Sequence, residues 1–556
     1  MAANGSYLSD PQYGYDVVVA ATEASVNATM LKYLLSLKDQ HTYLCYVQTS
    51  SDSEPHLIPY ADLLSKAQGS DPFKIKDAED PKTNQDIKNL AEVGFVAGVK
   101  ISLGVPSNYA PGSYSTLPKI VELQRNATVK YRMMCADITI VELIYDRWGS
   151  KWRSLSQSDE PNRCWNLVSD VNLLIDNVDK STPYANLPPA VQNQINNLSG
   201  SMFDIQQLLF DLNNAGLSSV PKIEGIVPNS KAAVLLSSYF VNTYFDAVQK
   251  AGAPVLNYTI VPRTQQEATL KPTSLNFHIG PLLHETDTSL KTLDYLCAVN
   301  NKKLPAPRDF GWDYISAADA QQAHGVIVIN RNTFAEYLRD VILKQAKELC
   351  FIPHVRSWND QGTQFECNPE FNPPNMVIDT NIPSTGETIL TMQYDKKAED
   401  ENGAGGALGA IVNECHFSAS VVARGNALHI ESSYRVHLYL RNTQTTSSAD
   451  VIHKIYHDKV ELAVDGAGRM EAKKSGTFED KKYEDKANAF MNFWAGVNAD
   501  FDKLKVLKYS GSDFEGLRVQ ELQNFIFPGG KTFAFKAFHF SDHQDLVASI
   551  TYADPA

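Results

Sequence analysis

Apolar and polar residues alternate over long stretches in the second half of the chain. In the segment 433–442, "SYRVHLYLRN", one side of an extended backbone carries Val436, Leu438 and Leu440, and the other carries Arg435, His437, Tyr439 and Arg441. The segment 458–466 repeats the pattern, with Val460, Leu462 and Val464 opposite Lys459, Glu461 and Asp465. A period of two predicts antiparallel strands with one face in water.

Two other segments have the longer period of a helix. The segment 486–509 spaces its apolar residues by three and four, which predicts an amphipathic helix with a largely aromatic stripe: Phe490, Phe493, Trp494, Val497, Phe501 and Leu504. The segment 232–248, "AAVLLSSYFVNTYFDAV", carries aromatic residues on more than one face: Tyr239, Phe240, Tyr244 and Phe245. Such a helix is either deeply buried or lines an apolar space.

The first half mixes strand and helix patterns. The segments 95–105 and 127–148 are rich in β-branched and aromatic residues, which predicts strands. The segment 202–216 predicts a helix that ends at Gly216, with one apolar face formed by Ile205, Leu208, Leu209 and Leu212. Near the end of the chain, the aromatic phase switches between Phe535 and Phe538, which predicts a β-bulge.

One short phrase occurs twice. "YGYD" at 13–16 matches "FGWD" at 310–313 at an offset of 297, and the offset also aligns Ala20–Ala21 with Ala317–Ala318. After a seven-residue insertion, Met30 aligns with Phe334, and Tyr33–Leu34 with Tyr337–Leu338. The shared order favours an internal duplication, with one half at 1–300 and the other at 301–556. We expect Asp16 and Asp313 to be structural residues that accept backbone N–H groups and fix a turn.

Composition narrows the class of protein. A chain of 556 residues with 43% hydrophobic and 21% charged residues predicts a soluble protein of several domains. The net charge of −14 disfavours nucleic acid as a partner. No secretory signal is visible, and the most apolar stretch, 232–248, is short and interrupted for a transmembrane segment. Seven scattered cysteines favour reduced thiols, so we expect a cytoplasmic protein.

Two histidine pairs and a glycine-rich segment resemble metal-binding or cofactor-binding motifs, but none has the features that such a site requires. His453 and His457, like His539 and His543, are four residues apart, but they lie on or beside predicted strands. Residues four apart on a strand are separated by about 13 Å, too far to share a metal ion. The glycine-rich segment 401–410 lacks the third glycine of a dinucleotide fingerprint and predicts a mobile hairpin loop instead. We therefore expect no metal and no cofactor, and no residue is marked as catalytic.

The two phrases, together with the closing segment "FIFPGGKTFAFKAFHFSDHQDLVASITY", resemble the clostridial neurotoxin-cluster proteins with a tubular lipid-binding (TULIP) fold. The resemblance implies an α+β fold in which long helices are wrapped by strongly curved antiparallel β-sheets, in two related halves. It also implies an elongated apolar tunnel. Its lining would come from Phe490, Phe493, Trp494, Val497 and Phe501 in one half, and from Tyr239, Phe240, Tyr244 and Phe245 in the other. Ordinary core packing is the alternative for each.

These observations lead to one main function and two alternatives. We expect a non-enzymatic protein that binds a lipid or another hydrophobic small molecule in the tunnel. A first alternative is an isomerase or cyclase that shapes a hydrophobic natural product there, which would require convergent polar groups in the pocket. A second is a scaffold or toxin-accessory interaction protein, which would show an extensive exposed apolar patch.

Overall fold

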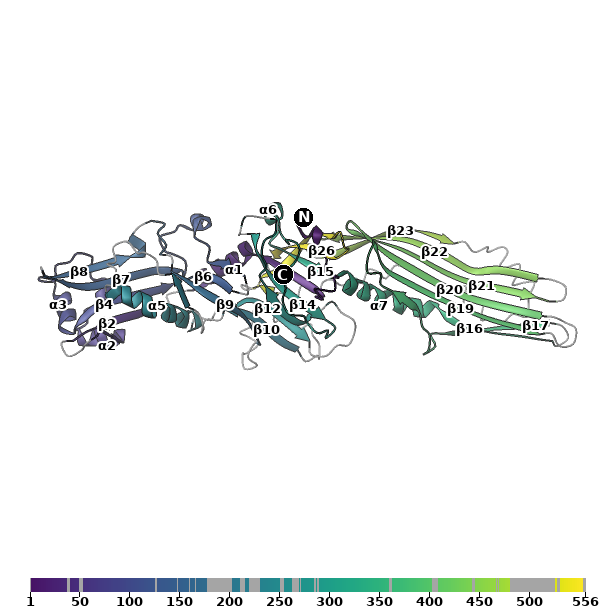
Figure 1. Cartoon of the computed structure of the whole chain (residues 1–556), viewed down its shortest axis with the longest axis horizontal. Helices are drawn as coiled ribbons and strands as arrows, with labels where there is room; N and C mark the ends of the chain where they lie inside the picture. Colours follow the sequence, from purple (N-terminus) through teal and green to yellow (C-terminus); the bar gives the residue numbers. More distant parts are fainter. Residues whose placement is uncertain are drawn as a thin grey trace.

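The computed structural model describes residues 2–177, 203–210, 216–219, 231–250, 255–262, 270–480, 526–527 and 531–553. Short gaps within the long stretches lie at 38–40, 50–53, 126–127, 148, 160, 166, 271, 285–286, 288–289, 360–362, 403–408, 443–445, 467 and 469. In the described part of the chain, the sheets of five, thirteen and six strands follow one another along an elongated molecule, and a two-stranded sheet lies beside the six-stranded one (Figure 1). The predicted helix at 486–509, and with it Phe490, Phe493, Trp494, Val497 and Phe501, lies outside the described residues.

The middle of the molecule is a 13-stranded sheet that joins distant parts of the chain. Its order begins β13-β14-β1-β15-β26-β25 and continues β24-β12-β10-β9-β6-β5, with β11 paired to β9. Its strands are β1 (Val17–Thr22), β5 (Val121–Leu123), β6 (Thr128–Arg132), β9 (Val168–Asn177), β10 (Phe203–Phe210), β11 (Gly216–Ser219), β12 (Val255–Pro262), β13 (Pro272–His278), β14 (Thr292–Val299), β15 (Gly325–Ile329), β24 (Ile526–Phe527), β25 (Lys531–Phe540) and β26 (Leu546–Ala553).

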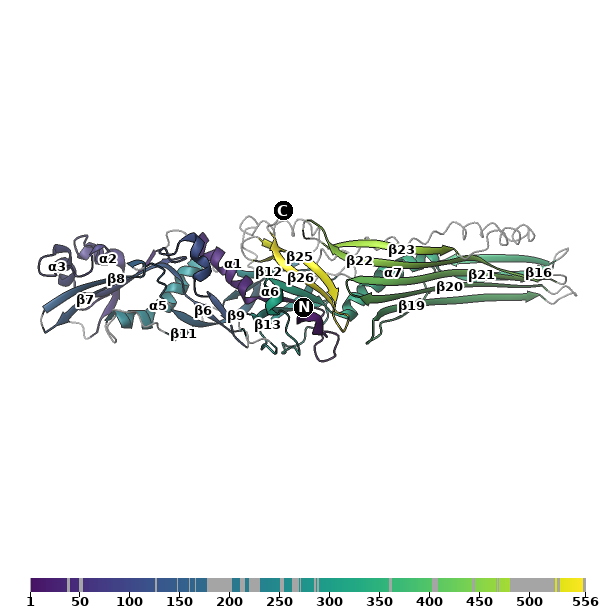
Figure 2. The same ribbon diagram turned by 90° about the horizontal axis from the view of Figure 1, so that it is seen from above.

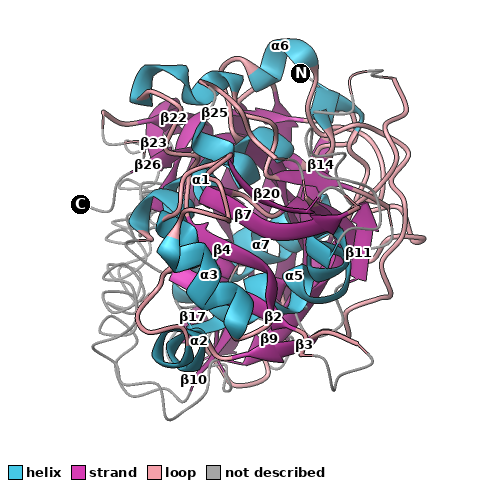
Figure 3. Ribbon diagram, turned by 90° about the vertical axis from the view of Figure 1, so that its left-hand side faces the viewer, coloured by secondary structure: helices cyan, strands magenta, loops and turns pink. Residues whose placement is uncertain are grey.

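A five-stranded sheet forms one end of the molecule, in the order β3-β2-β4-β7-β8 (Figure 1). Its strands are β2 (His41–Val47), β3 (His56–Ile58), β4 (Phe95–Leu103), β7 (Cys135–Asp146) and β8 (Gly149–Ser156). The helices at this end are α2 (Tyr60–Lys66), α3 (Gln85–Glu92) and α5 (Lys231–Lys250), with 3₁₀ turns η2 (Pro72–Lys74) and η4 (Gln157–Asp159). Figure 3 views the molecule from the end that carries α2 and α3. The strands predicted within 95–105 and 127–148 are confirmed.

A six-stranded sheet forms the other end, in chain order from β18 to β23. It contains β18 (Asp379–Asn381), β19 (Thr388–Asn402), β20 (Gly409–Arg424), β21 (Ala427–Arg441), β22 (Thr446–Val464) and β23 (Met470–Asp480), beside the hairpin β16 (Phe351–Asn359) and β17 (Thr363–Phe371). Val436, Leu438 and Leu440 are buried, and their polar neighbours are partly exposed, as the alternation predicts. Helix α7 (Arg331–Leu349) packs against β19 and β17.

The two copies of the repeated phrase meet at the central sheet. The ring of Tyr13 lies 5.3 Å from that of Phe310 and 5.1 Å from that of Trp312, and the Tyr13 hydroxyl accepts the N–H of Gly311 at 3.1 Å. Each phrase is followed by a strand and then a long helix: β1 and α1 (Glu23–Ser36), then β15 and α7. The two strands pair antiparallel, with Val17 opposite Ile329.

Both aspartates of the phrase have the predicted structural role. Asp16 accepts the N–H of Val299 at 2.8 Å, and Asp313 accepts the N–H groups of Leu283 and His284 at 2.9 and 2.8 Å. The Ala–Ala match is wrong, however, because Ala20–Ala21 lie in strand β1 whereas Ala317–Ala318 begin the short helix α6 (Ala317–Ala320). The first phrase leads directly into β1, whereas residues 314–324 separate the second phrase from β15. The duplication and the boundary at residue 300 stay predictions.

One predicted helix is wrong. Residues 203–210 form strand β10, which pairs with β12 on one side and β9 on the other. Two neighbouring strands satisfy its backbone N–H and C=O groups, and this tertiary pairing overrides the local helical period. The bulge near Phe535 is confirmed, because the register of β25 against β26 shifts between Phe535 and Ala537. The glycine-rich segment joins β19 to β20, whose pairing reaches Asn402 and Gly409.

Asp545 joins three distant parts of the chain beside this junction. One oxygen of its carboxylate, Oδ2, accepts hydrogen bonds from the hydroxyl of Ser6 at 2.8 Å and from the N–H of Leu8 at 2.7 Å. Both residues lie in the N-terminal segment that includes η1 (Ala2–Gly5). The other carboxylate oxygen of Asp545 accepts the N–H of Arg331 at 3.0 Å, in the first turn of α7. Burial raises the pKa of Asp545, and these hydrogen bonds act in the opposite direction.

We expect Asp545→Asn to lower the free energy of unfolding by about 2–3 kcal/mol, because the amide N–H₂ replaces a buried acceptor and faces donors. Urea unfolding of both proteins measures the difference. Asp542→Asn is the matched control, since Asp542 is exposed in the same turn. Equal stability of the Asp545→Asn variant and the parent protein would contradict the role given to Asp545.

Candidate functional site

Three of the aromatic residues predicted on α5 are buried in the main core. Phe240, Tyr244 and Phe245 lie between α5 and the neighbouring strands, and their rings contact one another at 5.7–6.0 Å. The Tyr244 hydroxyl donates to the carbonyl of Met134 at 3.0 Å and lies 3.4 Å from the Tyr131 hydroxyl. Burial raises the pKa of Tyr244 well above its usual value. Tyr244 therefore lies in the apolar core, and its hydroxyl is hydrogen-bonded there.

Tyr239 faces outward instead. Its side chain is 37% exposed and packs edge-on against Tyr46, with ring centroids 5.8 Å apart. The helix predicted at 232–248 is confirmed as α5, with apolar contacts on more than one face. A ligand-binding role for Tyr239, Phe240, Tyr244 and Phe245 stays a prediction.

Helix α1 lies near the middle of the molecule (Figure 2). An open apolar groove runs beside this helix. Its volume is about 380 Å³. One wall is the exposed face of α1, and the other is the segment 114–120, which includes the end of the 3₁₀ turn η3 (Pro111–Thr116). The apolar lining consists of Ala24, Ala28, Leu31, Tyr114, Leu117, Pro118 and Ile120. Groove volumes of roughly 300–1,000 Å³ are typical of small-molecule sites.

The sequence of α1 explains this open face. Thr22 caps the helix by accepting the N–H of Ser25 at 3.2 Å, and Glu23 places a negative charge in the first turn, where the helix dipole favours it. Met30 and Leu34 point into the main core. The small residues Ala24 and Ala28 fall one turn apart on the opposite, exposed side, and therefore leave space beside the helix.

Two polar side chains of α1 hold the second wall in place. Asn27 accepts the N–H groups of Ile120 and Val121 at 2.7 and 3.0 Å, and donates to the carbonyl of Val121 at 2.8 Å. The buried carboxylate of Glu23 accepts the Lys119 ammonium and the Leu123 N–H, each at 2.8 Å. These bonds engage both side chains within the protein, so they shape the groove and leave its surface apolar.

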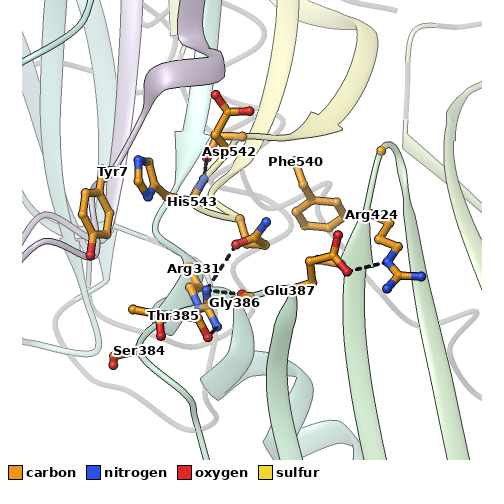
Figure 4. A pocket seen from close by; sticks show the side chains of 14 residues that line it. Tyr7, Arg331, Ser384, Thr385, Gly386, Glu387, Arg424, Phe540, Asp542 and His543 are labelled. Carbon is orange, nitrogen blue, oxygen red and sulfur yellow. Dashed lines mark hydrogen bonds and ion pairs between the residues drawn. The ribbon is translucent and has the colours of Figure 1, made fainter.

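A second, polar cavity of about 600 Å³ lies where α7, β25 and the six-stranded sheet meet (Figure 4). His543 stacks on Tyr7 at 3.9 Å on one side, and Arg424 pairs with Glu387 at 2.6 Å on the other. The buried Arg331 guanidinium donates to three backbone carbonyls, those of Thr385, Gly386 and Thr388, and to the Gln544 side chain. Arg331 thus anchors the loop before β19 to helix α7.

The paired histidines lie on or beside strands. His453 and His457 lie on strand β22, as expected, where His453 is 3.3 Å from Asp450 and His457 is 3.8 Å from Glu431. His539 is the last residue but one of strand β25, and His543 follows in the turn after it. Among the described residues, no group of three or more potential ligands is placed to hold a metal ion. None of the described helices is long and apolar enough to span a membrane.

Sequence reasoning missed the groove at α1. Its walls come from residues 23–31 and 114–120, about ninety positions apart, and neither carries a motif. The available signal was weak: the small residues Ala24 and Ala28 fall on the polar side of α1, one turn apart. Only the position of the second wall shows that they border a cavity.

Comparison with solved structures finds matches over nearly the whole chain. The crystal structure of P47 of Clostridium botulinum E1 is 11% identical, with 97% of this chain and 98% of that chain covered and a TM-score of 0.40. P47 from Clostridium botulinum A2 is 8% identical, with 97% of each chain covered and a TM-score of 0.40. Lipopolysaccharide binding protein is 11% identical, with 97% and 99% covered and a TM-score of 0.31. No family model and no curated protein matches the sequence.

The resemblance drawn from the two phrases agrees with these matches, which include P47 of Clostridium botulinum over nearly the whole chain. The described residues themselves form a mixed α+β fold built mostly of antiparallel sheets.

We expect Tyr244→Phe to lower the free energy of unfolding by about 1–2 kcal/mol, because the Met134 carbonyl loses its buried donor. Chemical unfolding tests the difference. Tyr145→Phe is the control, since Tyr145 is 62% exposed. If both variants matched the parent protein, the buried hydrogen bond would contribute nothing measurable.

Proposed function

We propose that the protein binds one hydrophobic small molecule, of the size of a single acyl chain, in the groove between α1 and the segment 114–120. The observation that carries the proposal is the groove itself. It offers about 380 Å³ of open space with predominantly apolar walls. Apolar surface that remains open in a folded protein is typical of a binding site.

The apolar side chains of the walls favour a ligand that binds by burying apolar surface. Leu31, Leu117 and Ile120 present branched alkyl groups, and Tyr114 presents a ring. Burying an alkyl chain against such walls contributes about 0.8 kcal/mol per methylene group before the costs of association. Ten buried methylenes would therefore provide about 8 kcal/mol, which corresponds to micromolar affinity at most. Such a site selects for length and shape more than for a particular chemical group.

The polar groups of the groove favour a binder over an isomerase or cyclase. Asn27 is saturated by backbone partners, and the carboxylate of Glu23 is occupied by Lys119 and by a backbone N–H. A general acid or base must be within reach of its substrate and free to exchange a proton. The two polar side chains that α1 contributes to the groove do not meet this condition.

The proposal includes the elongated tunnel in two curved, related halves. Ile120, which lines the groove, belongs to the same continuous apolar cluster as the aromatic residues Phe240 and Tyr244 of α5. A ligand in the groove therefore borders that core at Ile120. An acyl chain longer than the groove would extend in that direction, along the long axis of the molecule.

The test compares two variants that add the same bulk at different places. Ala28→Trp fills the groove, whereas Ala61→Trp adds an indole on the exposed face of α2. We expect the parent protein and Ala61→Trp to bind a fluorescent fatty acid with micromolar affinity, and Ala28→Trp to bind at least tenfold more weakly. Fluorescence titration measures all three, and native mass spectrometry gives the stoichiometry.

Circular dichroism spectra that superimpose would show that both variants fold. Equal affinity of Ala28→Trp and the parent protein for the fatty acid would show that the binding site does not lie beside α1. Failure of the parent protein to bind acyl chains of any length would refute the proposed function.

A further inference from the structure

A much smaller cavity lies beneath the second phrase, beside strand β14. Its volume is about 20 Å³, which is space for about one water molecule. Its walls come from Gly280–Leu282, from Leu290–Thr292 at the start of β14, and from the second phrase with the residue after it, Phe310 and Trp312–Tyr314. It is distinct from the apolar groove at α1 and from the polar cavity at Arg331.

Three buried polar atoms border this cavity. They are the Asp294 Oδ1, the Trp312 Nε1 and the Tyr314 hydroxyl. The Asp294 Oδ1 has no hydrogen-bond partner among the described residues, and the Trp312 and Tyr314 groups interact with each other without the geometry of a full hydrogen bond. They come from a strand and from a loop that covers it. Because buried polar groups in native proteins are almost always paired with protein or with ordered water, polar groups left incompletely paired around one cavity require a further partner.

We propose that this cavity is a binding site for one ordered water molecule, which bridges Asp294, Trp312 and Tyr314. The indole N–H is a donor only, so the water oxygen accepts it. The carboxyl of Asp294 and the hydroxyl of Tyr314 complete the site as donor or acceptor. Three hydrogen bonds are the usual number for a buried water, and the cavity has the volume for one.

The bridge connects the second phrase to the sheet beneath it. Strand β14 pairs with β1, and Asp294 lies opposite Ala20 of β1 and His278 of β13. Trp312 contacts Tyr13 of the first phrase. The water therefore lies where the two phrases, β1 and β14 are packed together.

The protonation of Asp294 supports the same geometry. Burial raises the pKa of Asp294 to about 8, and the Thr292 hydroxyl opposes the shift. At neutral pH the carboxyl is therefore mostly protonated and supplies an O–H to the network. The titratable and charged groups around it are His278 on β13, Lys291 at the start of β14, and Asp313 and Tyr314 in the covering loop, with Asp545 acting on Tyr314.

The raised pKa links the site to pH. The folded protein holds a proton on Asp294 that the unfolded chain loses from about pH 4 upward, the ordinary pKa being 3.8. The contribution of Asp294 to the free energy of unfolding is fully present below about pH 4. It decreases as the pH rises toward 8 and is constant above the pKa of the folded state.

High-resolution crystallography of the full chain tests the water site directly. We expect one solvent peak within hydrogen-bond distance of all three polar atoms in the parent protein, and also in Asp294→Asn, which keeps both a donor and an acceptor. Tyr314→Phe removes one partner, and the peak should weaken or disappear. An empty cavity in the parent protein and in Asp294→Asn, or an unchanged peak in Tyr314→Phe, would overturn the assignment.

Unfolding profiles test the proton linkage independently. We expect the midpoint of urea unfolding for Asp294→Asn to exceed that of the parent protein by an amount that grows from pH 5 to about pH 8 and is constant above it. Asp62→Asn is the control, because Asp62 is exposed on α2, and its profile should parallel that of the parent protein. Parallel profiles for Asp294→Asn as well would show that Asp294 does not hold the proton.

Discussion

The pairing of β1 with both β14 and β15 is the constraint on which the rest of the structure depends. β1 is buried on both faces: Val17, Val19 and Ala21 face the main core, and Val18 and Ala20 face a second cluster that contains both phrases. β1 lies between β14 and β15, so neighbouring strands pair with both of its edges while the two clusters cover its faces. Its neighbours come from residues 292–299 and 325–329, so the sheet forms only when parts of the chain almost three hundred positions apart have come together.

Buried hydrogen bonds fix the relative positions of the segments at this junction, which apolar packing alone would leave less specific. Asp16, Asp313 and Asp545 each accept hydrogen bonds from segments distant in sequence, and each is almost completely buried. A buried carboxylate is tolerated only when several donors converge on it, which makes the arrangement specific. The cavity beside Asp294 belongs to the same junction, and a bridging water there extends the network to the covering loop.

The groove at α1 is a consequence of the same junction. β1 leads directly into α1, so the position of the strand sets the direction of the helix. Asn27 and Glu23 then bind the segment 119–123, which brings the second wall alongside. Because Ala24 and Ala28 are small, the walls enclose space instead of packing together. The candidate site thus depends on polar contacts that fix the second wall beside α1 and on small side chains that leave space between the two walls.

Structural features that depend on residues close together in the chain follow from the sequence alone. The alternation at 433–442 and 458–466 predicted antiparallel strands, which are β21 and β22, the apolar content of 232–248 predicted α5, and the phase switch near Phe535 predicted the bulge. The roles of Asp16 and Asp313 also followed, because a short acidic side chain readily accepts backbone N–H groups and fixes a turn.

Tertiary structure decided what depends on distant partners. Residues 203–210 have a helical period, yet they form a strand because β9 and β12 satisfy their backbone groups. Ala20–Ala21 and Ala317–Ala318 share a sequence but belong to a strand and a helix, because only the first pair has strand neighbours on both sides. The groove and the small cavity beside Asp294 were invisible in the sequence for the same reason: an empty space is defined by walls that only folding brings together.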